Sequence, residues 1–405
     1  MSNTLLTIDM VTREALRVAH ESCSFISTTD RQYDDSFGKT GAKIGTALRV
    51  RKPNAYTRTT GSRVMDVQDQ EEANGTITVA TQDHVDMRFN SVELALSLDD
   101  FSKRYIEPAV KVLVSGIESD YLAFATKATY NVAGTAGTAI TSLVAPGAAR
   151  AKLNQGLAPK DNMRAIQMDS VTMGGLVNGV AAYFNPSNAI SDQYREGLVA
   201  RTAMADYYEN ERVWTLTNSN DVTGTTDAAA QVTDGGSTID MGDTITNAAA
   251  GSVCTVSGAY ARHPETKAAY PHLQQFVVTA NSSGLCTVSP STILTGARKN
   301  VVSSTGATLA TTDFNSKTLT FIGAASTSYV MPLMYHKEAF QFVTADLPLM
   351  DDAAKCVRRV QDGLSMRVWQ ASDIRNDEQL MRIDILYGMA ALRAEWACRM
   401  VGAAS

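Results

Sequence analysis

The residues closest to a nucleotide-binding motif are Phe37-Gly-Lys-Thr40, which have the ending of a phosphate-binding loop. Such a loop also needs a glycine five residues before Gly38, where the sequence has Tyr33. Residues 33–37 are acidic and aromatic, whereas a phosphate needs a glycine-rich backbone whose N–H groups approach closely. The sequence also lacks the GxGxxG, GxSxG and HExxH motifs. We therefore predict no nucleotide and no other cofactor.

Histidines and paired carboxylates are the other residues that could do chemistry. The histidines are not spaced i, i+4, as metal ligands on one helix would be: His20, His84, His263, His272 and His336. Carboxylates are adjacent at Asp34-Asp35, Glu71-Glu72, Asp99-Asp100 and Asp351-Asp352. Adjacent side chains point to opposite faces of a strand, so contiguity is no evidence for an acid–base pair. We predict no catalytic and no metal-ligating residue, although a Ser/His/Asp triad brought together by the fold stays open.

The cysteines are scattered along the chain: Cys23, Cys254, Cys286, Cys356 and Cys398. Their odd number and wide spacing predict reduced thiols that serve as small buried hydrophobic side chains. The N-terminus lacks the basic and apolar regions of a signal peptide, and no run of 18 apolar residues predicts a membrane span. We therefore expect synthesis inside a cell and no membrane partner.

The composition predicts a folded, mildly acidic protein. Of the 405 residues, 44% are hydrophobic and 19% are charged, and the formal net charge is −6. This content allows a sizeable core and argues against disorder. The net acidity argues against nucleic-acid binding through a basic surface.

Charge is distributed unevenly and marks one segment as different. Residues 219–335 hold seven acids and five bases, about 10% of the segment, whereas about 23% of the other residues are charged. The segment is rich in Thr, Ser and Gly and contains short β-type runs at Ser252–Ser257, Gln275–Thr279, Cys286–Ser289 and Lys317–Ile322. Short strands separated by turn residues predict a small barrel or sandwich. We predict an all-β module inserted into a host of the α+β class.

The first part of the host is predicted to contain a helix and an extended ribbon. Apolar residues at helical spacing predict an amphipathic N-terminal helix: Ile8, Val11, Ala15, Val18 and Ala19. Residues 46–90 are predicted to be extended, with Arg58 and Arg63 on one side of a polar tip and acids on the other, namely Asp66, Asp69, Glu71 and Glu72. An isolated ribbon is marginally stable, so we expect it to lie on its own body or on another copy.

A long helix is predicted after this ribbon. Apolar residues from Val110 to Phe124 recur at i, i+3, i+4 spacing, Asp99 or Asp100 can cap the helix, and Pro108 breaks or restarts it. About 20 residues, ending near Thr126, would span about 30 Å. The later predictions are a loop at Val132–Thr138, helices at 170–183 and 187–199, and strands at 163–168, Met204–Thr217, Ala339–Thr344, Val368–Trp369 and Met381–Leu386.

Three segments, in this order, carry a resemblance to a known family. Residues Leu96-Ser-Leu-Asp-Asp-Phe-Ser-Lys-Arg-Tyr-Ile-Glu-Pro108 resemble the passage from extended loop to spine helix in major coat proteins of P22-type phages, which have the HK97-like capsid fold. Ala182-Tyr-Phe-Asn-Pro186 resembles the turn of that family's axial domain. Leu380-Met-Arg-Ile-Asp-Ile-Leu-Tyr-Gly-Met389, followed by Trp396, resembles its closing peripheral strand. The low-charge β module stands where the family carries its insertion domain.

The resemblance implies a domain plan and a set of partners. The plan is an N-terminal arm (1–30), an extended loop with part of the peripheral domain (31–98), a spine helix (99–129), an axial domain (130–218), an inserted β domain (219–335) and return strands (336–405). The implied function is a major capsid protein that forms hexamers and pentamers of an icosahedral shell. The implied partners are copies of itself, a scaffolding protein, a portal protein and double-stranded DNA held by enclosure. The implied location is the virion, after assembly in the cytoplasm of the host bacterium.

Two sets of residues are candidates for contact between subunits. Ile8, Val11 and Val18 would contact a neighbour or the scaffold, unless the arm packs on its own body. Arg58 and Arg63, with Asp66, Asp69, Glu71 and Glu72, would pair with opposite charges on a neighbour, unless the loop is merely solvated. Two other functional classes stay open, a tail or surface-adhesion protein whose β module binds a receptor and an enzyme with an unrecognised site.

Overall fold

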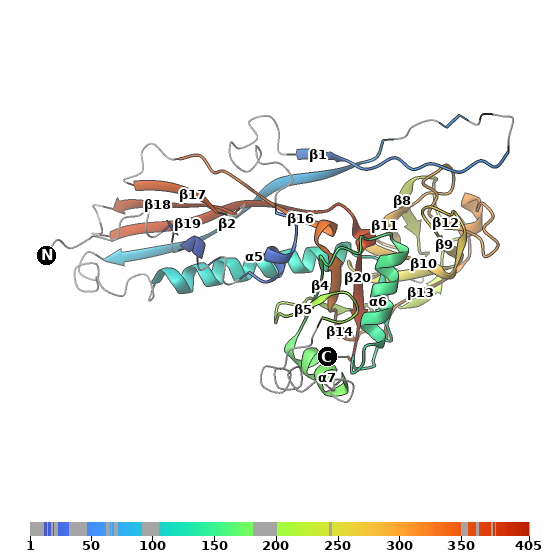
Figure 1. Cartoon of the computed structure of the whole chain (residues 1–405), viewed down its shortest axis with the longest axis horizontal. Helices are drawn as coiled ribbons and strands as arrows, with labels where there is room; N and C mark the ends of the chain where they lie inside the picture. The colour runs from blue at the N-terminus through green and yellow to red at the C-terminus, as the bar shows by residue number, and fades with distance from the viewer. Residues whose placement is uncertain are drawn as a thin grey trace. The chain divides into compact units, whose positions relative to one another are not determined.

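The computed structural model has the α+β class and contains two compact units, each described by itself below (Figure 1). Unit 1 comprises Met1–Val50, Gly75–Leu122 and Phe340–Leu392, and unit 2 comprises Arg51–Asn74, Ala123–Ala339 and Arg393–Ser405. The structure describes residues 12–13, 15–17, 19, 23–31, 47–61, 65, 67–68, 72–90, 105–180, 201–242, 245–349, 355–361, 364–373, 376 and 378–404. The predicted fold class is confirmed by these elements.

Unit 1 is built on a sheet with the order β1-β2-β19-β18-β17, in which β16 also pairs with β19. The strands are β1 (Ala47–Arg51), β2 (Asn74–Asn90), β16 (Phe340–Ala345), β17 (Lys355–Gln361), β18 (Leu364–Asp373) and β19 (Glu378–Ala391). Strand β2 runs antiparallel to β19 from Asn90 opposite Glu378 to Val79 opposite Gly388. Gly388 lies so close to the backbone of Thr78 that a Cβ atom there would meet the Thr78 carbonyl oxygen. The predicted strands near residues 340, 368 and 381 are therefore strands of one sheet.

The long helix α5 (Glu107–Ala128) follows the predicted apolar stripe. Its buried side chains include Val110, Leu113, Val114, Ile117, Tyr121 and Leu122. The helix begins at Glu107, and Pro108 stands in its first turn, where a missing N–H removes no helical hydrogen bond. In unit 1 the ring of Tyr121 packs 5.2 Å from that of Phe342 on β16. The proposed caps Asp99 and Asp100 lie outside the described residues.

Unit 2 contains a five-stranded sheet with the order β3-β20-β15-β4-β5. Its strands are β3 (Val132–Gly134), β4 (Arg164–Met168), β5 (Asp206–Glu209), β15 (Leu333–His336) and β20 (Ala397–Val401), with helices α6 (Val144–Gln155) and α7 (Ser170–Val180) in the same unit. Two predictions from the sequence need correction, and one helix was missed. The run from Val132 contains a strand rather than only a loop, because it pairs in parallel with β20. Helix α6 was not predicted, and residues 204–217 form two short strands, β5 and β6 (Thr215–Thr217).

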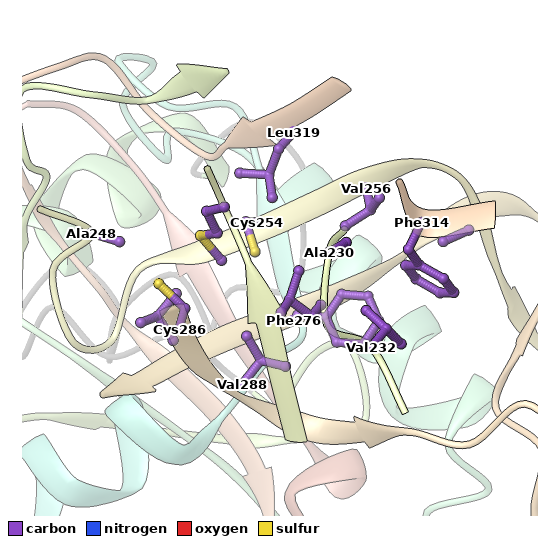
Figure 2. Packing of buried hydrophobic residues seen from close by; sticks show 14 of the residues in the cluster. Ala230, Val232, Ala248, Cys254, Val256, Phe276, Cys286, Val288, Phe314 and Leu319 are labelled. Atoms are coloured by element: carbon purple, nitrogen blue, oxygen red, sulfur yellow. The ribbon is translucent and has the colours of Figure 1, made fainter. Parts of the chain in front are cut away.

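The low-charge segment forms a seven-stranded sheet with the order β7-β13-β9-β10-β11-β8, in which β12 pairs with β9. The strands are β7 (Thr223–Thr225), β8 (Gly236–Asp240), β9 (Val253–Arg262), β10 (Ala269–Ser282), β11 (Leu285–Thr292), β12 (Val301–Val302) and β13 (Thr318–Phe321). Figure 2 shows side chains from β9, β10 and β11 gathered around Phe276, together with Phe314 and Leu319. The four β-type runs predicted from the sequence fall on β9, β10, β11 and β13, and the first and last runs extend one residue beyond their strands. A short ladder of β14 (Ser328–Val330) with β6 follows.

No helix in the described ranges is both long enough and apolar enough to cross a membrane.

Candidate assembly surface

The loop of residues 51–74 is closed at its base by contacts between its two arms. The backbone N–H of Lys52 donates to the carbonyl oxygen of Ala73 at 2.8 Å. Beside it, Arg51 Nε lies 3.6 Å from Glu72 Oε2, and both side chains are largely exposed. An exposed ion pair of this kind contributes about 0–1 kcal/mol. The contact gives Glu72, a predicted partner for a neighbouring subunit, an ion partner within its own chain.

A side-chain amide joins the two arms further along the loop. Gln68 Oε1 accepts a hydrogen bond of 2.8 Å from the Thr57 N–H, and Gln68 Nε2 donates one of 2.5 Å to the Thr57 carbonyl oxygen. These two bonds replace a pair of bonds in a β ladder and hold the arms side by side. Arg58, which follows, is exposed, so its charge is accessible as predicted for a contact residue. Arg63, Asp66, Asp69 and Glu71 lie outside the described residues.

The same loop exposes apolar side chains that the sequence did not single out. The exposed fractions of Met65, Val67 and Tyr56 are 85%, 78% and 56%. Several exposed apolar side chains on one loop are typical of a surface that contacts another molecule. These apolar residues could have been recognised in the sequence, because they interrupt an otherwise polar tip. The prediction of contact residues considered only the charged side chains of the loop.

The N-terminal segment is fastened to helix α5 within unit 1. The buried carboxylate of Glu118 accepts hydrogen bonds from the N–H groups of Ser24 and Phe25, at 3.0 and 2.5 Å, and from Ser24 Oγ at 3.0 Å. These contacts satisfy N–H groups at the start of helix α2 (Phe25–Thr28), which helix geometry leaves unpaired. The ring of Phe25 packs 4.7 Å from that of Tyr121. The segment near residue 25 is therefore anchored on its own unit.

The predicted apolar face of the arm is only partly described. Ala15 and Ala19 are buried, as is Leu16, which the stripe did not include. This burial favours the alternative that the arm packs on its own body around residues 15–19. The contact candidates Ile8, Val11 and Val18 lie outside the described residues.

Three of the described titratable side chains, His336, Cys286 and Cys398, are buried. His336 is fully buried, and its Nε2 lies 3.0 Å from Asp161 Oδ1. Burial raises the pKa of Cys286 to about 11 and that of Cys398 to about 12, so both thiols stay protonated and are poor nucleophiles. Within the described ranges no three His, Cys, Asp or Glu side chains are grouped to hold a metal ion.

Comparison with known proteins finds that part of the chain is similar to bacteriophage coat proteins, which are structural proteins of the virion. The family whose sequences match is P22 coat protein, described as gene protein 5, and the match covers residues 209–402, just under half of the chain. The resemblance predicted from the sequence is thereby confirmed.

Solved structures of phage particles are similar to the chain over most of its length. A structure of Mycobacterium phage Che8 is 9% identical, with a TM-score of 0.48 and coverage of 93% of this chain and 90% of that one. The capsid of Ralstonia phage GP4 is 7% identical, with a TM-score of 0.46 and coverage of 91% and 86%. The capsid of cyanophage P-SCSP1u is 12% identical, with a TM-score of 0.43 and coverage of 89% and 84%. No curated protein matches the chain significantly.

Proposed function

We propose that this chain is the repeating subunit of a phage shell, in which copies of it form hexamers and pentamers of an icosahedral capsid that encloses double-stranded DNA. The match of residues 209–402 to a coat protein family is the observation that carries the proposal. The role is structural rather than enzymatic, and DNA is held by enclosure rather than by sequence-specific binding. Assembly in the host bacterial cytoplasm, on a scaffolding protein and around a portal, belongs to the same proposal.

The order of the elements supports an HK97-like plan for the subunit. We assign residues 1–30 to the arm, 31–98 to the extended loop with part of the peripheral domain, and 99–129 to the spine helix. Residues 130–218 are assigned to the axial domain, 219–335 to the inserted β domain and 336–405 to the return strands. The 17 residues of β2, the 22 residues of α5 and the low-charge sheet support this division.

The loop of residues 51–74 is the proposed contact with a neighbouring subunit. It presents exposed Arg58 and the apolar side chains of Tyr56, Met65 and Val67. Each exposed ion pair contributes only about 0–1 kcal/mol, but a closed shell repeats every contact many times. The face formed by Ile8, Val11 and Val18 is a second proposed contact.

Negative-stain microscopy and sedimentation velocity of the purified full chain test the proposal. We expect capsomers or closed shells whose fraction rises with protein concentration, because assembly of copies follows mass action. A chain that remains monomeric at every concentration, with and without a crowding agent, would contradict it. Sensitivity to 1 M NaCl, where the Debye length is about 3 Å, would show how much of the contact is electrostatic.

A further inference from the structure

A groove of about 810 Å³ in unit 2 lies between the first arm of the loop and the inserted sheet. The arm contributes residues 52–58 to its lining, and the turns that follow β9 and β11 contribute residues near 264 and 297. Arg298 links the two walls, because its Nη2 donates a hydrogen bond of 3.1 Å to the carbonyl oxygen of Pro53. The volume falls within the range of about 300–1,000 Å³ that is typical of ligand sites.

The lining of this groove is strongly basic. The loop contributes Lys52 and Arg58, the inserted segment contributes Arg262, Lys267, Arg298 and Lys299, and Arg393 completes the set. The only acids among the described lining residues are Glu265 and Glu395. The seven bases and two acids among its described lining residues sum to a formal charge of +5 in a chain of −6, so all other residues together carry −11. We call this set of residues the cationic groove.

Backbone carbonyls, rather than carboxylates, hold several of these cations in place. Lys267 Nζ donates to the carbonyl oxygens of Pro264, at 2.5 Å, and Ala297, at 2.7 Å. Arg262 Nε donates to the Lys267 carbonyl at 3.0 Å and its Nη1 to the Lys299 carbonyl at 3.3 Å. These contacts fix the positions of Lys267 and Arg262, and a neutral carbonyl group adds no full negative charge beside either cation.

Burial, and then repulsion from Arg262, lowers the pKa values of two of these bases. Burial and then the charge of Arg262 lower the pKa of Lys267, although Glu265 opposes the shift. Burial and Arg262 also lower the pKa of Lys299. A bound anion would relieve this repulsion, because opposite charge within a few ångströms favours the protonated form of each lysine.

We propose that the cationic groove binds the acidic arm, residues 66–72, of a second copy of this chain. The acidic arm has the four carboxylates Asp66, Asp69, Glu71 and Glu72 within seven residues. The inference rests on the proposed function, since it requires copies to associate, and it names the receiving surface for the charges of the loop.

Two described residues of this arm, Gln68 and Glu72, make contacts within the same copy. Gln68 is bonded to Thr57, Glu72 lies beside Arg51, and none of the described residues from 65 to 73 lines the groove. The net charge of −11 on the other residues adds a general attraction between copies, which speeds encounter without fixing the register. The carboxylates of the arm supply the specific partners.

A labelled peptide of residues 64–74, titrated with the full chain, tests the site without requiring assembly. We expect saturable binding to the wild type and binding weaker by about tenfold or more to R298E/K299E and to K299E alone, because reversed charge repels the arm. The matched control is K317E, which changes the one base of the inserted segment that does not line the groove. Circular dichroism of each variant checks that the fold is retained.

Three results of this titration would overturn the inference. They are equal binding of a peptide in which Asn and Gln replace the acids, unchanged binding to both K299E and R298E/K299E, and tighter binding of a single-stranded oligonucleotide at the same site. The last result would assign the groove to nucleic acid.

A charge exchange in the assembling chain separates this inference from the proposed function. D69K/E71K and R298E/K299E should each reduce shell formation, and the four changes together should restore it. Normal assembly of R298E/K299E would overturn the groove contact while leaving the shell subunit intact. A wild type that binds the peptide but forms no capsomers would overturn the proposed function and support the groove.

Discussion

The guanidinium of Arg399 on β20 donates a hydrogen bond of 2.7 Å from Nη1 to the carbonyl oxygen of Gly251, the residue that precedes β9 by two positions. Its Nε donates another, of 2.8 Å, to the carbonyl oxygen of Thr129 just after helix α5. The side chain is fully buried, and burial lowers its pKa. One cation therefore joins the last strand, the end of the long helix and the entrance to the inserted sheet within unit 2.

Replacing Arg399 by methionine should lower the free energy of unfolding by about 1–3 kcal/mol. Two buried carbonyl groups lose charged donors, and removal of the desolvated cation offsets only part of the loss. The measurement is urea unfolding of R399M beside R150M, which alters an exposed arginine on α6 of the same unit. Equal stability of R399M and the wild type would show that the two bonds contribute nothing net.

Replacing Asp384 by asparagine should lower the free energy of unfolding by about 3–5 kcal/mol, because a buried cation is left without its counter-charge. Arg367 Nε lies 3.0 Å from Asp384 Oδ1 and its Nη2 lies 2.5 Å from Oδ2, and both residues are buried in the sheet of unit 1. The double variant R367M/D384L should lower the free energy of unfolding by less than D384N alone, because it leaves no unpaired buried charge.

The control for this pair is Asp206→Asn, which breaks the exposed ion pair between Arg201 and Asp206. This substitution should lower the free energy of unfolding by no more than about 1 kcal/mol. If D384N and D206N change the denaturation midpoint equally, burial is not what makes the Arg367–Asp384 pair important.

Unit 2 should lose stability as the pH falls from about 6.5 to about 4, partly through His272. Burial, followed by the charge of Lys152, lowers the pKa of this imidazole from 6.5 to about 4. The unfolded chain binds a proton near pH 6.5, while the folded chain resists protonation until about pH 4, so protons favour unfolding between these values. A shift of this size would correspond to about 3 kcal/mol, which partial exposure of the ring reduces to about 1–2 kcal/mol.

The test is to compare unfolding free energies at pH 7 and pH 5 in the wild type and H272Q. The variant should depend less on pH by about 1 kcal/mol over this interval, which covers only part of the window between the two pKa values. His263→Gln is the matched control, because His263 stacks on the same ring of Tyr270 as His272 does. Identical pH dependence in H272Q and the wild type would contradict the assignment.

Replacing Glu118 by alanine should release the segment near residue 25 before it affects the rest of the chain. Three hydrogen bonds to one buried carboxylate are lost, at a cost of about 1–3 kcal/mol. Hydrogen exchange should rise at Ser24 and Phe25, and limited proteolysis should cleave there faster. The control is K111A on the same helix, which removes an exposed i, i+4 contact with Glu107 and should cost only a few tenths of a kcal/mol. Unchanged exchange in E118A would mean that the aromatic packing of Phe25 holds the segment by itself.

Periodic elements were predictable because their pattern reflects burial on one face. The apolar stripe of α5 and the alternation at the start of β2 each identify an element with one buried side, whereas β19 alternates in sequence although Asp384 on its other face is also buried. The inserted β sheet was predictable from its low charge and its turn residues. By contrast, α6 has Pro146 and Gly147 in its first turn and only three buried side chains, so its pattern is weak. Strand β20 is buried on both faces and includes Arg399, so it shows no alternation.

The sequence by itself therefore determined the α+β class, the long helix, the inserted β segment and the charges of the loop. It also carried the resemblance to phage coat proteins. These features depend on neighbours in the chain, where spacing and composition report burial directly.

Only the tertiary structure decided which charges meet. Four bases of the inserted segment are spread over more than 30 positions, from Arg262 to Lys299, and Lys52 is some 200 residues away, yet all of these bases line one groove. Likewise Glu118 caps a helix that begins 93 residues earlier. Such contacts follow from how distant segments pack, because the Coulomb energy depends on distance in space rather than on separation along the chain.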